Sequence, residues 1–329
     1  MGSVGFDRRS LFTRNHSDSN RDSEANKLST KVHISTKHET RAGYAFLSPF
    51  FILFGIFGLL PILFTIYVSF FNWDLLGTQE WVGFSNYIEL FQDSRFYQSL
   101  GNTISIFLLS SVPQLISALL LAIVLNSKSL KLRTFWRAVI LFPFITSTVA
   151  VAVVFGAMFA DHGGMMNWGL QLLGLQPIMW HADTLPGQIV IALMVNWRWT
   201  GYNTLIFLAA LQSIPAELYE AAEVDGASKL SQFFNITIPQ IRPTIFFTVV
   251  TSTIGGLQIF AEPFQFGGGN YSGGASGQFR TVTLFLFDQA FSQLRLGYSS
   301  AIAIGLSLII AVVVGINFFI SNKLVKGDK

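Results

Sequence analysis

The sequence predicts an all-α, polytopic membrane protein with about six transmembrane helices. Of its 329 residues, 51% are hydrophobic and only 12% are charged, too few charges to cover a soluble domain of this size. A helix that spans the hydrocarbon layer needs about 20 apolar residues. Windows of that kind predict six helices: Ala45–Phe71, Ile104–Asn126, Ala138–Ala160, Gly187–Ala209, Thr244–Ala261 and Tyr298–Ser321.

The distribution of basic residues predicts the orientation of these helices. Lys and Arg collect on the cytoplasmic side of a membrane protein. The segments before Ala45, from Ser127 to Arg137, from Leu211 to Arg242 and after Ser321 hold 8, 4, 2 and 3 of them, whereas the alternate segments hold 1, 0 and 2. We therefore expect six crossings with both termini in the cytoplasm.

The first 40 residues differ in composition from the rest. Met1–Thr40 is rich in Ser, Asn, Asp, Lys and Arg and has too few apolar residues to bury a core, so we expect a disordered cytoplasmic tail followed by one membrane domain over residues 41–329. The apolar run that begins near Ala45 is far longer than the core of a cleaved signal peptide. We expect the first helix to remain in the mature protein.

Motifs of catalysis and of nucleotide binding are missing from the sequence. The glycine-rich stretch Gly267–Gly277 follows no predicted strand, and the Gly-Lys pair of a phosphate-binding loop occurs nowhere in the chain. HExxH and GxSxG arrangements are also absent, and His162 and His181 are too far apart to form a recognisable metal-ligand pair. Without cysteine, disulfides and thiolate metal sites are excluded. We expect no enzyme activity and no bound cofactor.

A polar segment between the fourth and fifth predicted helices carries the most specific pattern. Pro215 suits the first turn of a short helix, acidic residues follow at three-residue spacing from Glu217 to Glu223, and Gly226 provides a stop. A second short helix is expected over Ser228–Asn235, limited by Pro239 and Pro243. These features predict two short helices outside the bilayer with an acidic rim.

The spacing in this segment resembles the EAA loop of ABC import permeases. Glu220 begins the triplet Glu220-Ala221-Ala222 and is followed six positions later by Gly226; Ile236 and Pro239 come next, with Ile238 where that family usually has Leu. The wider run DGAS-x4-FFNITIP is similar to the carbohydrate branch that includes the maltose transporter, and the resemblance extends from about residue 41 to about residue 326.

The resemblance implies a membrane-spanning permease subunit of an ATP-driven sugar or oligosaccharide importer in a bacterial or archaeal cell (inner) membrane. Its expected partners are a second permease subunit, two ATPase subunits that bind the ATP and Mg, and an extracytoplasmic sugar-binding protein, with no nucleic acid. Loop 215–239 would couple to the ATPase through Glu220, Ala221, Ala222, Asp225, Gly226, Ile236 and Pro239. The alternative is that Glu220 only stabilises a helix start, by about 0.3–1 kcal/mol.

Polar and aromatic residues within three of the apolar helices predict a substrate pathway, because such groups face a neighbouring helix or a water-filled path. Sugars need hydrogen-bond partners for their hydroxyls and aromatic rings for their C–H faces. By resemblance to the sugar-holding maltose permease subunit, the matching positions are Phe144, Thr148, Trp197, Trp199, Thr251, Gly255 and Gln258, and we rank Trp197 first. Trp199 replaces a glycine of that subunit and Gly255 an asparagine. The alternative for each residue is helix packing.

Arg198 is the one charge inside the predicted helices. An arginine at a helix centre costs about 2.5–3.5 kcal/mol on insertion scales, so it needs water or a carboxylate nearby. It would attract an anionic substrate such as a glycerol or sugar phosphate, or form a structural ion pair with Glu262 or with the companion subunit; we favour the ion pair.

Two other classes of protein remain as alternatives to an importer subunit. A stand-alone secondary transporter would show coupled ionisable residues and internal repeats, neither of which we find. A scaffold protein would have no need of the EAA spacing.

Overall fold

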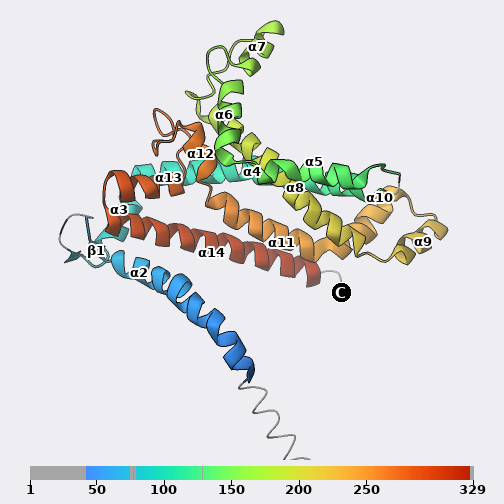
Figure 1. The fold of residues 1–329 in the computed structure, drawn as a ribbon, viewed down its shortest axis with the longest axis horizontal. Coiled ribbons are helices and arrows are strands. Elements are labelled where there is room, and N and C mark those ends of the chain that lie inside the picture. Colours follow the sequence, from blue (N-terminus) through green and yellow to red (C-terminus); the bar gives the residue numbers. More distant parts are fainter. Residues whose placement is uncertain (1–41, 75–76, 78, 128, 327–329) are drawn as a thin grey trace, which may run out of the picture. The chain divides into compact units, whose positions relative to one another are not determined.

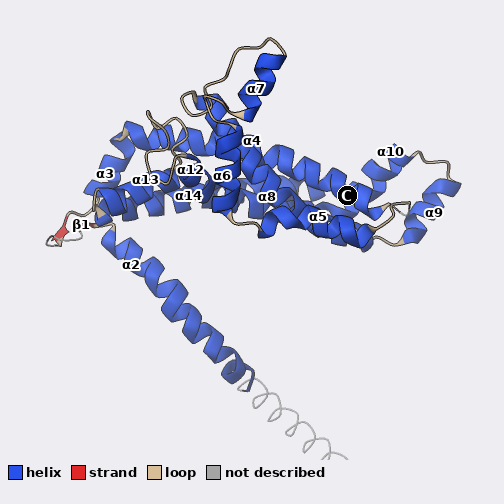
Figure 2. Cartoon of the chain, turned by 45° about the horizontal axis from the view of Figure 1, so that its top comes forward, coloured by secondary structure: helices blue, strands red, loops and turns tan. Residues whose placement is uncertain are grey.

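The computed structural model describes residues 42–74, 77, 79–127 and 129–326, with side chains as far as Ile320 (Figure 1). The predicted tail, residues 1–40, lies outside the described residues. Contacts divide the chain into two units, Met1–Phe64 and Thr65–Lys329. Helices make up most of the described chain (Figure 2), which confirms the predicted fold class.

The first unit contains the start of a long apolar helix, Ala42–Val68. This helix includes a π-helical turn, η1 (Gly55–Leu59), and continues as α2 (Leu60–Val68). Large apolar side chains of the unit are exposed, among them Phe46 and Phe57. An exposed surface of this kind is typical of a helix that faces lipid or another membrane helix.

The second unit is a bundle of helices with one small hairpin. In the hairpin, β1 (Phe71–Asn72) pairs antiparallel with β2 (Glu80–Trp81). The helices before the polar loop are α3 (Ser85–Gln92), α4 (Ser94–Asn126), α5 (Arg133–Ile145), α6 (Thr148–Met158), α7 (Met165–Leu172) and α8 (Thr184–Gln212). From the loop onward they are α9 (Ala216–Val224), α10 (Lys229–Gln232), η2 (Phe233–Thr237), α11 (Ile238–Leu257), α12 (Ala261–Phe266), α13 (Val282–Phe287), η3 (Asp288–Ser292) and α14 (Leu296–Lys326).

The helix lengths agree with the predicted number of crossings. Within the described residues, four helices are long and apolar enough to span a membrane, and the number rises to six if each of two bent pairs counts as one span. The bent pairs are α5 with α6, at 89°, and α8 with α9, at 67°.

The third predicted helix, Ala138–Ala160, is wrong as a continuous element. The chain leaves the helical region at Thr146 and Ser147, between α5 and α6. The Thr146 hydroxyl donates a hydrogen bond of 3.0 Å to the Phe142 carbonyl, the group that the Thr146 N–H would bond in a continuing helix. Thr200 makes the same bond to the Asn196 carbonyl within the continuous helix α8, so this bond accompanies the break and does not by itself cause it.

The second short helix of the polar loop, expected over Ser228–Asn235, is wrong as a separate element. It begins at Lys229 as α10 but runs on through η2 into α11, so that residues 229–266 form one candidate span. Pro239 therefore does not end the helix. The π-helical turn directly before it widens the backbone where a proline ring otherwise meets the carbonyl four residues earlier.

The packing of α8 against α4 and α5 organises the second unit. α8 makes its most extensive contact with α4, and residues of both helices form a core with Ile241 of α11. At Gly201 an added Cβ would lie 1.8 Å from the Ile140 carbonyl oxygen of α5. Only a residue without a side chain permits this close approach of two helix backbones.

Buried amide groups close one end of the second unit. The Gln188 amide donates hydrogen bonds to the Asn102 side chain at 2.9 Å and to the Gln278 carbonyl at 3.0 Å. The Asn102 amide in turn donates to the Gly277 carbonyl at 2.8 Å. These bonds attach the glycine-rich loop 267–277 and its neighbours to α4 and α8, and they satisfy amides that are costly to bury unpaired.

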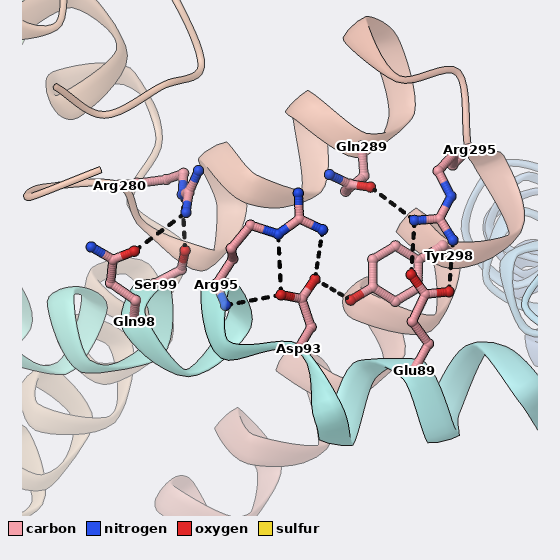
Figure 3. Close-up of polar contacts among 9 residues, drawn as sticks. All are labelled: Glu89, Asp93, Arg95, Gln98, Ser99, Arg280, Gln289, Arg295 and Tyr298. Atoms are coloured by element: carbon pink, nitrogen blue, oxygen red, sulfur yellow. Dashed lines mark hydrogen bonds and ion pairs between the residues drawn. The ribbon is translucent and has the colours of Figure 1, made fainter. Parts of the chain in front are cut away.

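An ion-pair network, formed by Glu89, Asp93, Arg95, Arg295 and Tyr298, joins α3 and the start of α4 to the start of α14 (Figure 3). Arg295 holds Glu89 with two hydrogen bonds, of 2.8 and 2.6 Å. Asp93 caps α4 by accepting from the Arg95 N–H at 2.9 Å, and it also accepts from the Tyr298 hydroxyl at 2.9 Å. α9 and α10 lie at the opposite end of this unit (Figures 1 and 2).

We expect Gly201→Ala to lower the free energy of unfolding by about 1–3 kcal/mol, because the added Cβ forces α8 away from α5. The thermal unfolding of the purified protein in detergent measures this loss. Gly101→Ala is the matched control, since an added Cβ on α4 meets nothing within 4 Å there, and it should leave the unfolding temperature unchanged or slightly raised. Equal unfolding temperatures for both variants would contradict the close packing.

Asp93 should make the stability of the protein depend on acid pH. Burial raises the pKa of Asp93, but hydrogen bonds from the Arg95 side chain and backbone and from Tyr298 outweigh it and hold the pKa below its usual value. The carboxylate therefore stabilises the fold above about pH 3.9, the unfolded value, and this contribution is lost as the pH falls through the lower native pKa. Since Arg95 is half exposed, the contribution of the Asp93 carboxylate to the free energy of unfolding should not exceed about 1 kcal/mol.

Unfolding temperatures of the wild type and of Asp93→Asn, measured from neutral pH downward, check this expectation. The gap between the two should be constant near neutral pH and should close in acid. A gap that stays the same throughout would show that Asp93 contributes nothing through its charge.

Candidate functional site

The first helix of the polar loop, α9, ends in a glycine cap at Gly226. Gly226 has a φ of +76°, the left-handed conformation that glycine adopts without strain. The Ala227 N–H bonds the Ala222 carbonyl at 2.8 Å, and the Gly226 N–H bonds the Glu223 carbonyl at 3.1 Å. This pair of bonds is the Schellman motif, and it turns the chain sharply away from α9.

The surface of the loop combines acidic with apolar side chains. Glu220 is exposed, as are the apolar side chains of Val224, Leu230 and Phe234, which are 88%, 68% and 59% accessible. The predicted coupling residues Ala221, Asp225 and Gly226 are exposed as well, whereas Ala222, Ile236 and Pro239 are half-buried. Large exposed apolar side chains are typical of surfaces that contact another protein or a membrane.

Two side-chain contacts hold the two halves of the loop together. The hydroxyls of Tyr219 on α9 and Thr237 on η2 lie 2.9 Å apart. Lys229 at the start of α10 forms an ion pair with Glu223 of α9. Side-chain contacts as well as the backbone thus join α9 to α10 and η2.

A cavity of about 620 Å³ lies between α8 and α11, with further lining from α4, α6 and α12. Five of the seven predicted pathway residues line it, and these are Thr148, Trp199, Thr251, Gly255 and Gln258. A Cβ at Gly255 would meet nothing within 4 Å, so this glycine leaves the space free. The volume is within the range of small-molecule sites.

Aromatic rings gather at one wall of this cavity. Trp199 and Tyr202 line it, with ring centroids 5.9 Å apart. Phe144, a sixth predicted residue, packs on both of them, with centroids 5.1 Å from Trp199 and 4.8 Å from Tyr202. Asn203, Gln114 and Ser252 supply polar groups to the same lining. Rings beside amides and hydroxyls suit a ligand with both apolar faces and hydroxyl groups.

Trp197, the residue ranked first from the sequence, lies elsewhere. It lines a second cavity, of about 550 Å³, together with Pro113 of α4 and Ile140 of α5. Residues two apart on a helix point about 200° from each other, so Trp197 and Trp199 face opposite sides of α8. The candidate site therefore rests on Trp199.

The same helical spacing identifies site residues that the sequence analysis missed. On α8 the cavity is lined by Val195, Arg198, Trp199, Tyr202 and Asn203, a pattern of three- and four-residue steps along one face. Applied to Trp199, this spacing points to Tyr202 and Asn203. The lining residues of α4 carry no comparable signal in the sequence, because their position depends on how α4 packs on α8.

Arg198 forms its ion pair within this cavity. Its Nη1 donates a hydrogen bond of 2.6 Å to Oε1 of Glu262 on α12, and the two side chains are 14% and 7% exposed. Glu262 was one of the two partners considered from the sequence. Among the described residues, no group of three His, Cys, Asp or Glu side chains is arranged to hold a metal ion.

The sequence is similar to curated permease proteins along most of its length. It is 34% identical over 288 residues to the arabinooligosaccharides transport system permease protein AraP of Bacillus subtilis, covering 87% of this chain and 90% of that protein. It is 34% identical over 285 residues to the lactose transport system permease protein LacF of Rhizobium radiobacter, covering 85% and 94%. It is 30% identical over 280 residues to the trehalose/maltose transport system permease protein MalF of Thermococcus litoralis, covering 85% and 92%.

The fold is similar to that of a solved transporter. A chain in the crystal structure of a bacterial ABC transporter involved in the import of the acidic polysaccharide alginate matches with a TM-score of 0.72 at 24% identity, covering 85% of this chain and 94% of that one. The family described as binding-protein-dependent transport system inner membrane component matches residues 114–326, a range that contains the polar loop and all of the cavity lining except Ser111. With this match and the identities above, the chain belongs to the family of binding-protein-dependent transport system inner membrane components.

Proposed function

We propose that this chain is the permease subunit of an ATP-driven importer of a sugar or an oligosaccharide. The cavity between α8 and α11 carries the proposal, because its aromatic wall and polar lining suit a saccharide. Relatives named as permeases for arabinooligosaccharides, lactose and trehalose or maltose support the same substrate class.

The polar loop is proposed to couple transport to ATP hydrolysis on a separate chain. Glu220, Val224 and Leu230 present an exposed acidic and apolar surface, and the glycine cap at Gly226 sets the angle at which α9 is presented. ATP and Mg bind to that partner ATPase. This chain binds no cofactor of its own.

The proposed assembly contains a second permease subunit, two ATPase subunits and an external sugar-binding protein. The description of the family names its dependence on a binding protein, and the alginate transporter is also known in complex with a periplasmic protein that holds an alginate pentasaccharide. Basic residues favour a cytoplasmic position for the polar loop and for both termini, in a bacterial or archaeal cell membrane.

The substrate prediction compares two tryptophans of the same helix. We expect Trp199→Ala to reduce sugar uptake at least about tenfold, because it removes a ring that would pack on the C–H face of a sugar, and burying a large apolar side chain fully is worth about 1.5–3 kcal/mol. Trp197→Ala, which alters the other side of α8, should retain most of the uptake. Proteoliposomes with the complete transporter and a panel of sugar-loaded binding proteins provide the measurement.

The opposite ranking of the two variants would move the site to the cavity around Trp197. A panel in which no sugar stimulates ATP hydrolysis by the wild type would overturn the proposed substrate class.

The coupling prediction concerns Glu220 and Gly226. Glu220→Ala should lower the sugar transported per ATP hydrolysed by about tenfold, within the usual range of coupling free energies. Gly226→Val should do the same, because a left-handed conformation costs a residue with a side chain about 1–2 kcal/mol. Both proteins should still insert into the membrane.

Two further variants of the same loop serve as controls for the coupling prediction. Glu217→Ala removes an exposed acid from the first turn of the same helix, and Gly226→Asn keeps a residue that tolerates the left-handed conformation. Both should couple normally. Normal stoichiometry in Glu220→Ala and Gly226→Val would instead show that the loop is only a connection between helices.

A further inference from the structure

The cavity between α8 and α11 contains one positive and one negative side chain. Arg198 and Glu262 are the charged residues of its described lining, and they are bound to each other at 2.6 Å. Both side chains are largely buried. The rest of the lining is aromatic, aliphatic, amide, hydroxyl or glycine, so the net charge that a bound molecule meets is close to zero.

The pairing of Arg198 with Glu262 changes the charge that a molecule in this cavity would meet. An isolated buried charge is costly, and an opposite charge beside it offsets much of that cost. An unpaired Arg198 would bind a carboxylate or a phosphate, because the guanidinium group presents a planar fork of donors. With Glu262 in place, an incoming anion meets a carboxylate that already balances the charge of the guanidinium.

The guanidinium keeps unused hydrogen-bonding capacity. Its Nε is buried and has no hydrogen-bond partner among the described residues, and a single hydrogen bond, from Nη1, joins it to Glu262. Glu262 is itself held in place at the start of α12, next to the buried Pro263. The carboxylate thus balances the charge of Arg198 without saturating its donors.

We propose that Glu262 determines the charge selectivity of this cavity: by pairing with Arg198 it makes the site electrically neutral, so that the site accepts uncharged saccharides and rejects saccharides that carry carboxylates or phosphates. The inference rests on the proposed function, because it assigns the substrate class of the same cavity. Glu262 acts here through Arg198 and is a positioning residue.

Three variants test the proposal from both sides. Glu262→Gln keeps the shape and an acceptor for Nη1 but leaves Arg198 positive. Arg198→Gln leaves Glu262 negative. The double variant Arg198→Gln with Glu262→Gln is neutral again and serves as the matched control. Because the two single variants shift the charge in opposite directions, either one decides the question if the other fails to assemble.

The probes are lactose and maltotriose, each with its counterpart in which C6 hydroxymethyl groups are oxidised to carboxylates. Binding is measured by calorimetry on the assembled permease and ATPase complex in nanodiscs. The external binding protein is omitted because its own specificity would mask that of the cavity. The quantity compared is the ratio of the affinities for the uncharged and the oxidised form of each sugar.

We expect the wild type and the double variant to prefer the uncharged form by at least about tenfold, since a carboxylate that leaves water for a neutral site loses hydration without gaining an opposite charge. In Glu262→Gln this ratio should fall at least about tenfold, and the gained affinity for the anion should weaken with added salt. In Arg198→Gln the ratio should increase. A purely structural ion pair would lower the affinity for both forms equally.

An unchanged ratio in Glu262→Gln and in Arg198→Gln, with sugar still bound, overturns this inference and leaves the proposed function intact. A wild type that binds none of the four probes overturns the inference together with the saccharide cavity on which it rests.

Discussion

The close packing of α8 between α4 and α5 is the constraint on which the rest of the second unit depends. α8 lies along α4 over an extensive interface, and Gly201 allows its backbone to approach that of α5. Because this position is fixed, the two sides of α8 border two different cavities. One side presents Trp199, Tyr202 and Arg198 to the cavity shared with α11, and the other presents Trp197.

The polar loop is connected directly to both walls of the candidate site. α8 leads into α9 through Ser213, Ile214 and Pro215, and η2 continues without a break into α11. Both ends of α9 thus lead along the chain into helices that line the cavity. Tyr219 contacts Thr237 and Lys229 pairs with Glu223, so side chains as well as the backbone join the two halves of the loop. This continuity provides a physical route from the loop to the site.

The far end of the unit is held by polar contacts of long sequence separation. Arg295 binds Glu89, and the Gln188 amide bonds both Asn102 and the backbone beside the glycine-rich loop. In a membrane protein such contacts supply specificity that apolar packing lacks, because lipid is as apolar as the side chains that face it. The unit thus has a polar, fixed end and, opposite to it, an end at which an exposed loop is available for a partner.

The sequence alone determined the features that depend on local chemistry. Apolar windows identified the membrane helices, the Glu220 to Pro239 spacing identified the loop, and Gly226 marked the end of α9, because helix formation and capping act over a few residues. Tertiary structure decided the rest. The break after Ile145 and the merging of α10 with α11 appear only in the folded chain, and the choice of Glu262 as the partner of Arg198 joins residues 64 positions apart. The side of α8 that meets α11 is likewise set by packing, so only the folded chain distinguishes Trp199 from Trp197.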